Sequence, residues 1–317
     1  MDQLSIIVPC YNEEQTVELF YTEVQKVVEQ MPDIQTEYLF VDDGSTDRTL
    51  EKIKELHARD KRVKYISFSR NFGKEAAMYA GLVNATGKYT CIVDGDLQHN
   101  PKYLLDMLHF LEENEDYDEV AMVMHERKNE SSFMKFCKNK FYKIIDKLSD
   151  VHFENGASDF RMFNEKVKNA VISLAEKNRF SKGIFAWVGF NIKYLEYDVE
   201  PRKSGKSNFN FKNSLNYALD GILAFSTKPM QIAFKLGIFF MMAFFVYLIV
   251  LLIQLLAIGI AWNPTYVVIL LILLIAGLQF IVLGIISEYL AKAYLEIKNR
   301  PIYIAKEKIG FDKKSIL

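Results

Sequence analysis

The first 113 residues alternate short apolar runs with longer amphipathic segments. Strands are predicted at Ser5–Cys10, Tyr38–Val41, Val63–Phe68 and Tyr89–Val93, and helices at Glu14–Met31, Thr46–Asp60, Gly73–Thr86 and Pro101–Glu113. Repeated strand–helix–strand units are typical of a parallel sheet that helices cover on both faces. Open α/β sheets bind their ligands at the carboxyl ends of the strands. The alternation therefore predicts an α/β domain and indicates which loops should carry its ligand site.

Polar residues follow each of the four predicted strands. The four clusters are Pro9-Cys10-Tyr11-Asn12-Glu13, Asp42-Asp43-Gly44-Ser45-Thr46-Asp47, Ser69-Arg70-Asn71-Phe72-Gly73-Lys74 and Asp94-Gly95-Asp96-Leu97-Gln98. Because a parallel sheet brings such loops to one rim, they are expected to converge on a pocket. Four unrelated polar turns are the alternative.

Asp94-Gly95-Asp96 gives the most specific chemical signal in the chain. Its two carboxylates follow a buried strand at a spacing of two residues, so they can share one divalent cation. Hard oxygen ligands suit Mg²⁺ or Mn²⁺, and such an ion takes further ligands from water and a substrate diphosphate. An acidic turn is the plain alternative, but the neighbouring polar clusters favour a metal site for nucleotide-diphosphate chemistry.

The composition excludes several other classes of protein. The chain has 317 residues and a formal net charge of −1, which argues against a nucleic-acid partner. Its three cysteines, Cys10, Cys91 and Cys137, are too widely spaced for a zinc site or a disulfide framework. A GxGxxG fingerprint does not follow the first strand, and no Walker-type phosphate loop is found.

Two long apolar runs distinguish the C-terminal part. Leu236–Trp262 and Tyr266–Ile286 each exceed the roughly 20 residues of a membrane span, so two transmembrane helices are predicted at about 236–260 and 266–288. A buried helical hairpin is the alternative. Lysine and arginine flank the pair on both sides, which predicts an inner or plasma membrane protein with both termini cytoplasmic. Phe133–Leu148 and Phe211–Phe225 have amphipathic patterns that suit a lipid surface, although the first could instead pack on the domain.

Taken in order, the motifs resemble those of family 2 glycosyltransferases with the GT-A fold. The closest resemblance is to polyprenyl-phosphate glycosyltransferases, the group of bactoprenol glucosyltransferase and dolichol-phosphate mannose synthase. It is carried by the four polar clusters and by Ser158-Asp159-Phe160-Arg161, Trp187-Val188-Gly189-Phe190 and Arg202-Lys203-Ser204-Gly205-Lys206-Ser207. Gly95 departs from the pattern, since the family often has Ala there; the carboxylates are unaffected.

Hydropathy, charge pattern and the resemblance together predict a division of the chain into four parts. Residues 1–210 would form a cytoplasmic GT-A catalytic domain with a Rossmann-like sheet, and 211–229 an interfacial amphipathic helix. Residues 230–291 would hold the two transmembrane helices, and 292–317 a basic cytoplasmic tail.

Site roles also follow from the resemblance. Asp94, Asp96 and Gln98 would hold Mg²⁺ or Mn²⁺, and Asp96 and Asp159 would be catalytic. The nucleotide-sugar donor would be bound by Pro9, Tyr11, Glu13, Asp42, Asp43, Asn71, Lys74, Asp94 and Gln98, and the acceptor phosphate by Arg127, Arg202 and Lys206. Simpler roles compete: helix capping for Asp43 and Asp47, capping at a strand end for Asp159, a solvated helix start for Lys74, and a surface cation for Arg127.

The expected enzyme is a metal-dependent inverting hexosyltransferase. It would move a hexose from a nucleotide diphosphate sugar, with UDP favoured, to polyprenyl phosphate such as undecaprenyl phosphate, for cell-envelope glycosylation. A homo-oligomer, contact with membrane lipid, and a separate flippase and downstream transferase are expected. The alternatives are a family 2 transferase with another lipid or glycan acceptor, and a non-catalytic scaffold that binds nucleotide sugars.

Overall fold

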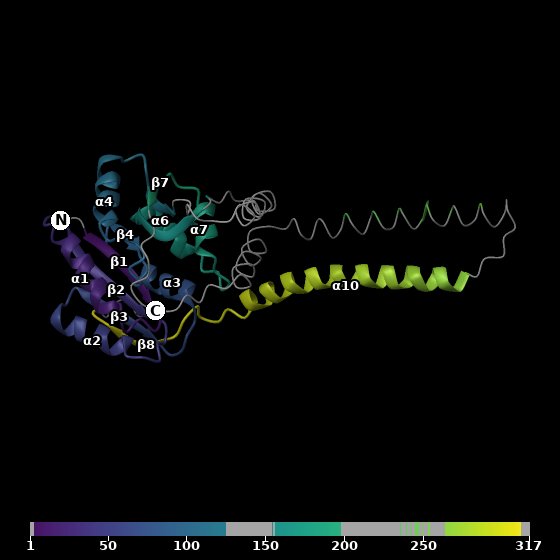
Figure 1. The fold of residues 1–317 in the computed structure, drawn as a ribbon, viewed down its shortest axis with the longest axis horizontal. Coiled ribbons are helices and arrows are strands. Elements are labelled where there is room, and N and C mark those ends of the chain that lie inside the picture. Colours follow the sequence, from purple (N-terminus) through teal and green to yellow (C-terminus); the bar gives the residue numbers. More distant parts are fainter. Residues whose placement is uncertain are drawn as a thin grey trace.

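A mixed eight-stranded sheet forms the centre of the protein, with strand order β7-β5-β6-β4-β1-β2-β3-β8 (Figure 1). This computed structural model describes residues 3–124, 154, 156–197 and 264–311, together with isolated positions between 235 and 253. The strands are β1 (Gln3–Cys10), β2 (Gln35–Asp42), β3 (Val63–Phe68), β4 (Tyr89–Ile92), β5 (Glu119–Met124), β6 (Ala157–Asn164), β7 (Ile192–Tyr197) and β8 (Ala305–Ile309). The helices are α1 (Val17–Val28), α2 (Thr49–Arg59), α3 (Lys74–Asn84), α4 (Tyr103–Glu113), α6 (Glu165–Ser173), α7 (Ser181–Trp187) and α10 (Pro264–Ile297).

The four strands predicted from the sequence form the middle of this sheet. β4, β1, β2 and β3 are neighbours and run parallel, as expected for strands joined through helices. The sheet as a whole is mixed, however, because β6 runs antiparallel to β4 and β5, and β8 runs antiparallel to β3. The α/β class is confirmed, and the expectation of a parallel sheet holds for its central strands.

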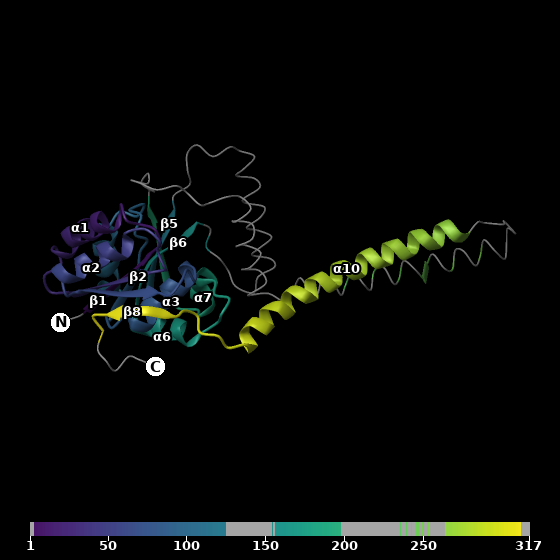
Figure 2. The same ribbon diagram turned by 90° about the horizontal axis from the view of Figure 1, so that it is seen from below.

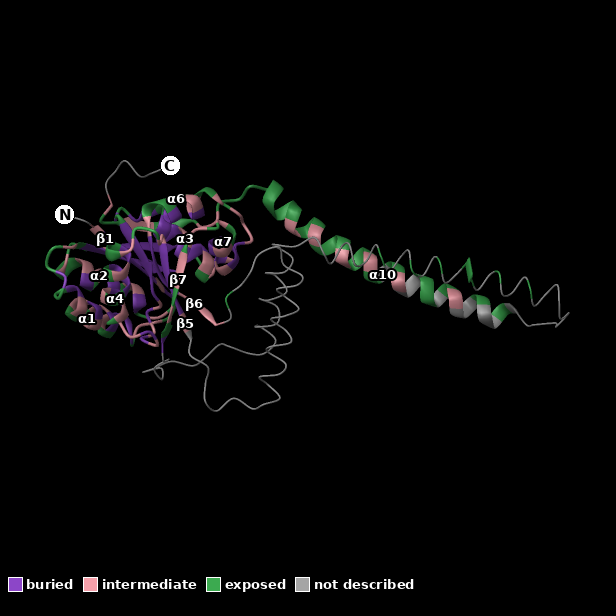
Figure 3. Ribbon diagram, turned by 90° about the horizontal axis from the view of Figure 1, so that it is seen from above, coloured by how far each residue is buried: buried purple, intermediate pink, exposed green. Residues whose placement is uncertain are grey.

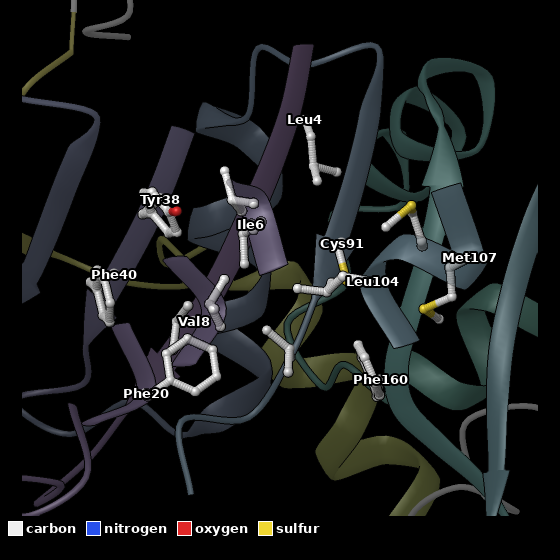
Figure 4. Close-up of a cluster of buried hydrophobic side chains, with 14 of the residues drawn as sticks. Leu4, Ile6, Val8, Phe20, Tyr38, Phe40, Cys91, Leu104, Met107 and Phe160 are labelled. Atoms are coloured by element: carbon white, nitrogen blue, oxygen red, sulfur yellow. The ribbon is translucent and has the colours of Figure 1, made fainter. Parts of the chain in front are cut away.

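Helices cover both faces of the sheet, which explains why the central strands are apolar almost throughout. Along β1, Leu4, Ile6 and Val8 point into the core under α1, α2 and α4, whereas Ile7 packs on the opposite side with α3 and α6. This alternation is the period of two of a strand buried on both faces. Figure 3 shows the buried interior between the helix layers, and Figure 4 shows the larger cluster, in which Phe20 lies beside Val8.

The C-terminal segment joins the same sheet. β8 pairs with β3, and Ser69 N–H donates to the carbonyl of Ile304 just before it. The rings of Phe68 and Tyr303 stack at 4.9 Å, and Glu307 forms an ion pair with Lys54. Figure 2 shows this strand along the edge of the sheet. The tail therefore covers an edge strand of its own domain, which protects backbone groups that would otherwise be left unpaired.

The structure does not support the predicted pair of membrane spans. Among the residues that the structure describes, no helix combines the length and the apolarity that crossing a membrane requires. The predicted second span, 266–288, lies within α10, which continues past Glu288 and Lys292 to a docking contact of Glu296 with the backbone N–H groups of Lys177 and Asn178. The predicted localisation in an inner or plasma membrane, with cytoplasmic termini, depended on these spans and is contradicted as well.

Several other predicted segments lie outside the described residues. These are the amphipathic segment Phe133–Leu148, the interfacial helix 211–229 and, apart from isolated positions, the first predicted span at 236–260.

Candidate active site

A pocket opens at the carboxyl ends of the central strands, where the sequence predicted it. Its lining comes from all four predicted clusters: Pro9, Cys10, Tyr11, Glu13, Asp43, Asn71, Gly73, Lys74, Ala77, Asp94, Gly95 and Asp96. Loops that are far apart in the sequence thus meet at one rim, because β1, β2, β3 and β4 run parallel and end on the same side. The convergence of the four clusters is confirmed.

The loops after β1 and β2 are fastened to each other. The side-chain oxygen of Asn12 accepts from the backbone N–H of Thr46 at 2.9 Å, and Asn12 N–H donates to Ser45 Oγ at 3.0 Å. Asn12 adopts a left-handed backbone, with φ of 56°, a conformation that Asn tolerates better than most residues. Tyr11 is left 43% exposed at the pocket, where its ring can stack on a planar ligand.

Glu13 and Asp47 support this end of the pocket. The backbone N–H of Glu13 donates to Thr49 Oγ1 at 2.7 Å, and its carboxylate accepts from the Thr16 hydroxyl at 2.6 Å. The Asp47 carboxylate accepts from the backbone N–H groups of Glu14 and Thr49. Asp47 therefore stabilises the start of α2, as the capping interpretation predicted.

Asp42 and Asp43 have different surroundings although they are adjacent. Asp42 is 1% exposed and lies behind the pocket lining, where its carboxylate accepts from Ser67 Oγ and Ser45 N–H. Asp43 lines the pocket and accepts from the backbone N–H groups of Phe72 and Gly73, at 2.6 and 2.9 Å. Burial raises the pKa of Asp43 above its ordinary value, against the lowering effect of these two bonds.

The bonds made by Asp43 hold the loop that leads into α3. Gly44 makes this contact possible: its φ is +67°, and a Cβ there would lie 2.4 Å from the carbonyl carbon of Arg70. Gly73, with φ of +97°, then turns the chain into α3. Asn71 is exposed on this loop and lines the pocket. The carboxylate of Asp43 therefore binds the backbone just before α3. The sequence had suggested a capping role for Asp43 but not which helix it would serve.

Lys74, the first residue of α3, links two carboxylates across the site. Its Nζ lies 2.7 and 2.9 Å from the two oxygens of Asp94 and 2.7 Å from Oδ2 of Asp159. Burial alone would lower the pKa of Lys74, but Asp159 and Asp94 outweigh it and raise that pKa above its ordinary value. Lys74 is therefore a cation held between carboxylates, which is more than the solvated helix start considered as its alternative.

Asp159 is held as an anion by the same contact. Burial alone would raise the pKa of Asp159, but the charges of Lys74 and Lys182 hold it well below its usual range. Lys74 also donates a hydrogen bond to Asp159. Asp159 lies on β6, which pairs with β4, the strand that ends just before Asp94, and this antiparallel pairing brings the two carboxylates to one place.

Asp96 completes the acidic edge of the pocket. Its Oδ1 accepts from the backbone N–H of Gln98 at 3.1 Å, which fixes the short turn after β4. Leu97 in this turn has a left-handed φ of 59°. Gln98 is half-buried beside the pocket and does not line it. A Cβ on Gly95 would meet Val8 at an ordinary 3.4 Å, so the alanine common in the resembling family would fit.

These residues suit a divalent cation that the substrate helps to bind. Asp94 and Asp96 offer carboxylate oxygens, the ligand type that Mg²⁺ and Mn²⁺ prefer. Across the described parts of the chain, no group of three or more His, Cys, Asp or Glu side chains is arranged to hold a metal. Two carboxylates combined with substrate phosphates and water are a usual set for Mg²⁺, so the donor set fits such an ion.

Behind Asp159 lies a group of buried polar residues that the sequence did not single out. His99 is 7% exposed, and its Nε2 contacts the Tyr197 hydroxyl at 2.9 Å and Ser158 Oγ at 3.2 Å. Burial lowers the pKa of His99, which favours its neutral form. Ser158 Oγ accepts from the backbone N–H of Phe160, so this group fixes the backbone on both sides of Asp159.

A buried ion pair supports the same strand. Arg161 on β6 lies 2.7 Å from Glu119 on β5, with side chains 5% and 0% exposed, and it also donates to the carbonyl of Ser158. Burial raises the pKa of Glu119 despite the opposing charge of Arg161. Arg161 belongs to the motif Ser158-Asp159-Phe160-Arg161 noted in the sequence. Glu119 begins β5, and nothing in its sequence surroundings indicates a buried ion pair.

The three residues expected at the acceptor phosphate, Arg127, Arg202 and Lys206, lie outside the described residues. Their assignment stays a prediction.

Known proteins resemble this chain in sequence over most of its length. Residues 5–170 match the family described as Glycosyl transferase family 2. The chain is 40% identical over 307 residues to a putative glycosyltransferase, CsbB, of Bacillus subtilis (strain 168), covering 96% of this chain and 91% of that protein.

Other relatives have more specific names. The chain is 35% identical over 307 residues to a bactoprenol glucosyl transferase of Shigella phage SfII, covering 96% of this chain and 98% of the relative. A crystal structure of glucosyl-3-phosphoglycerate synthase from Mycobacterium tuberculosis with Mn²⁺, uridine diphosphate and phosphoglyceric acid has a TM-score of 0.48 and 16% identity, covering 70% of this chain and 76% of that one. The family match and the extended identity to these relatives place the chain in glycosyl transferase family 2.

Proposed function

We propose that the protein transfers a hexose from a nucleotide diphosphate sugar to polyprenyl phosphate, in a GT-A type site. UDP-glucose is the proposed donor, and undecaprenyl phosphate the proposed acceptor. The names of the bactoprenol glucosyl transferases support this choice of sugar and carrier. The observation that carries the proposal is the convergence of Asp94, Asp96 and Asp159 with Lys74 beside a pocket that the aromatic ring of Tyr11 also lines.

The donor would lie along this pocket. Pro9, Tyr11 and Glu13 are placed to take the nucleoside, through ring stacking and hydrogen bonds from ribose or base. Asn71 and Lys74 also line the pocket, and the proposal assigns them to the diphosphate. Asp94 and Asp96 would hold Mg²⁺ or Mn²⁺, which when bound neutralises the charge of the departing diphosphate. Gln98 would orient this turn through its bond to Asp96.

Asp159 would act on the acceptor. A phosphate monoester has a second pKa of about 6, so the acceptor is largely a dianion near neutral pH and needs little activation. Because Lys74 lowers the pKa of Asp159 and keeps it ionised, Asp159 is a weak base, and its proposed role is to position the acceptor, which reacts as the dianion. An oxygen of the acceptor phosphate then attacks the sugar C1 while the bond from C1 to the nucleoside diphosphate breaks. A single displacement of this kind inverts the anomeric centre.

The direct test is transfer by the full chain in detergent. The protein is incubated with undecaprenyl phosphate, a panel of UDP- and GDP-sugars, and Mg²⁺ or Mn²⁺, and the lipid fraction is analysed by mass spectrometry. A hexosyl product that forms from one donor, requires the metal and is absent with undecaprenol supports the proposal. An assignment of the anomer by NMR checks inversion.

Two outcomes would contradict it. Transfer to a diacylglycerol or a glycan but not to undecaprenyl phosphate would keep the enzyme class and replace the acceptor. Nucleotide-sugar binding without transfer to any acceptor would favour the non-catalytic alternative.

A further inference from the structure

Lys74 contacts both carboxylate oxygens of Asp94, a residue that is also a proposed metal ligand. Its Nζ lies 2.7 Å from Oδ1 and 2.9 Å from Oδ2 of Asp94, so neither oxygen is without a cation beside it. These contacts disfavour a divalent cation at Asp94, because the ammonium and the metal compete for the same negative charge.

The side chain of Lys74 is more exposed to solvent than the two carboxylates that it contacts. Its side chain is 42% exposed, whereas those of Asp94 and Asp159 are 26% and 17% exposed. The four-carbon stem of lysine is flexible, and its ammonium is a point charge that can change partners at small cost. The backbone of Lys74 does not need to shift with it, because Asp43 holds the preceding residues Phe72 and Gly73.

From these contacts we infer that Lys74 is a resident counter-ion that lowers the affinity of the empty site for a divalent cation. It holds Asp94 and Asp159 together before the donor arrives, and it leaves Asp94 when the metal and the donor diphosphate bind. The inference rests on the proposed function in that it takes Asp94 and Asp96 as the metal carboxylates. Metal binding would then depend on the nucleotide, because the diphosphate offers the displaced ammonium new negative charge.

The consequence can be measured by metal binding without any reaction. Free Mn²⁺ is followed by electron paramagnetic resonance while the full chain is titrated with Mn²⁺, with and without UDP. Without nucleotide, Lys74→Met should bind Mn²⁺ about three- to tenfold more tightly than the unaltered protein, since one opposing contact is lost. The factor by which UDP strengthens Mn²⁺ binding should shrink to a similar extent, because the two effects are linked.

Matched variants separate the contact from a general change of charge. Lys182 lowers the pKa of Asp159 through its charge, so Lys182→Met removes the same charge from the same neighbourhood. Lys74→Arg keeps a cation that can bridge the carboxylates and should retain the weak binding. Asp96→Asn should weaken Mn²⁺ binding in every background. The inference is overturned if Lys74→Met binds Mn²⁺ no more tightly than the unaltered protein, or gains no more than Lys182→Met.

A measurement on the unaltered protein covers the case in which Lys74→Met does not fold. Lysines are acetylated briefly with acetic anhydride, and the modified sites are quantified by mass spectrometry. Added Mn²⁺ should raise the acetylation of Lys74, while lysines remote from the pocket such as Lys26 keep their rate. An unchanged rate at Lys74 under saturating Mn²⁺ would overturn the inference.

These results are distinguishable from failure of the proposed function. If Lys74 affects Mn²⁺ binding but no sugar is transferred, the inference about Lys74 stands and only the proposed donor or acceptor is contradicted. If neither the unaltered protein nor Lys74→Met binds Mn²⁺ in a way that depends on Asp96, the inference and the metal role both fail.

Discussion

Lys74 Nζ and Asp159 Oδ2 lie 2.7 Å apart although the two residues are separated by 85 positions in the chain. The contact joins the start of α3 to β6, and it also reaches Asp94 at the end of β4. One ammonium thus connects the part of the site expected to take the donor with the carboxylate expected to take the acceptor. This arrangement explains why a residue that resembles a solvated helix start in sequence lies at the centre of the site.

The first prediction concerns Asp96. Asp96→Asn should leave the fold intact and lower the rate of transfer by at least about 100-fold, because an amide oxygen replaces a charged metal ligand. Rates are measured by product formation at saturating Mn²⁺, and stability by thermal unfolding. Asp106→Asn, on the exposed face of α4, is the matched control and should be as active as the unaltered enzyme. Near-normal turnover of Asp96→Asn would contradict the metal assignment.

The second prediction compares two glycines of the same rim. Gly44→Ala should lower the free energy of unfolding by more than about 1 kcal/mol, because its φ is +67° and the added methyl would overlap the backbone of Arg70. Binding of UDP should weaken as well, since Asp43 can no longer hold the loop before α3. Gly95→Ala should be tolerated, because its methyl meets Val8 at 3.4 Å in ordinary contact. Denaturant titration and calorimetry with UDP test both variants; equal losses would contradict the steric argument.

The third prediction is a pH dependence that arises far from the pocket. Glu37 is 2% exposed and accepts from Ser5, Thr86 and Lys64. Burial alone would raise the pKa of Glu37, but these partners lower it below the ordinary 4.5. A carboxyl with a lowered pKa in the folded state stabilises the protein above the unfolded pKa, and this stabilisation is lost as the pH falls through the folded value.

Glu37→Gln should therefore cost about 2 kcal/mol at pH 7 and much less near pH 3. Denaturant unfolding at several pH values gives both quantities. Glu55→Gln, on the exposed side of α2, is the control and should follow the unaltered protein at each pH. A cost that stays constant from pH 7 to pH 3 would show that the charge of Glu37 is not its source.

The fourth prediction concerns the buried pair behind Asp159. Arg161→Met should cost about 3–5 kcal/mol because it leaves the fully buried Glu119 without its partner. Replacing both, Arg161→Met with Glu119→Leu, should recover most of that loss in thermal or denaturant unfolding. Transfer should stay low in the double variant, since Arg161 also donates to the carbonyl of Ser158 beside Asp159. Full recovery of the rate with stability would show that Arg161 has no part in placing Asp159.

Part of the site could be predicted from local pattern alone. Strands β1 to β4 are short and apolar between helices of clear period, and a parallel arrangement brings their polar ends together whatever the details of packing. That is why Tyr11, Asp43, Lys74 and Asp94 were expected at one rim and line one pocket. The spacing of Asp94 and Asp96 likewise needs only the geometry of an extended chain.

The helix that contains the apolar run at 266–288 makes contacts that local pattern does not indicate. Hydropathy counts side chains along the chain, and it does not say where a helix ends or what it contacts. In the structure the run is part of α10, which continues through charged residues until Glu296 binds the backbone of Lys177 and Asn178. Similarly, nothing in the sequence of Ala305–Ile309 indicates that it pairs with β3 instead of ending as a free tail.

Hydrophobic period and chain direction were enough to predict the α/β class, the parallel centre of the sheet and the loops that meet at its rim. The tertiary structure decided the antiparallel placement of β6 and β8, the buried pair of Arg161 and Glu119, and the contact of Lys74 with Asp94 and Asp159. These depend on pairing between strands and on side chains remote in sequence, and the free energy of such contacts exists only after the chain has folded around them.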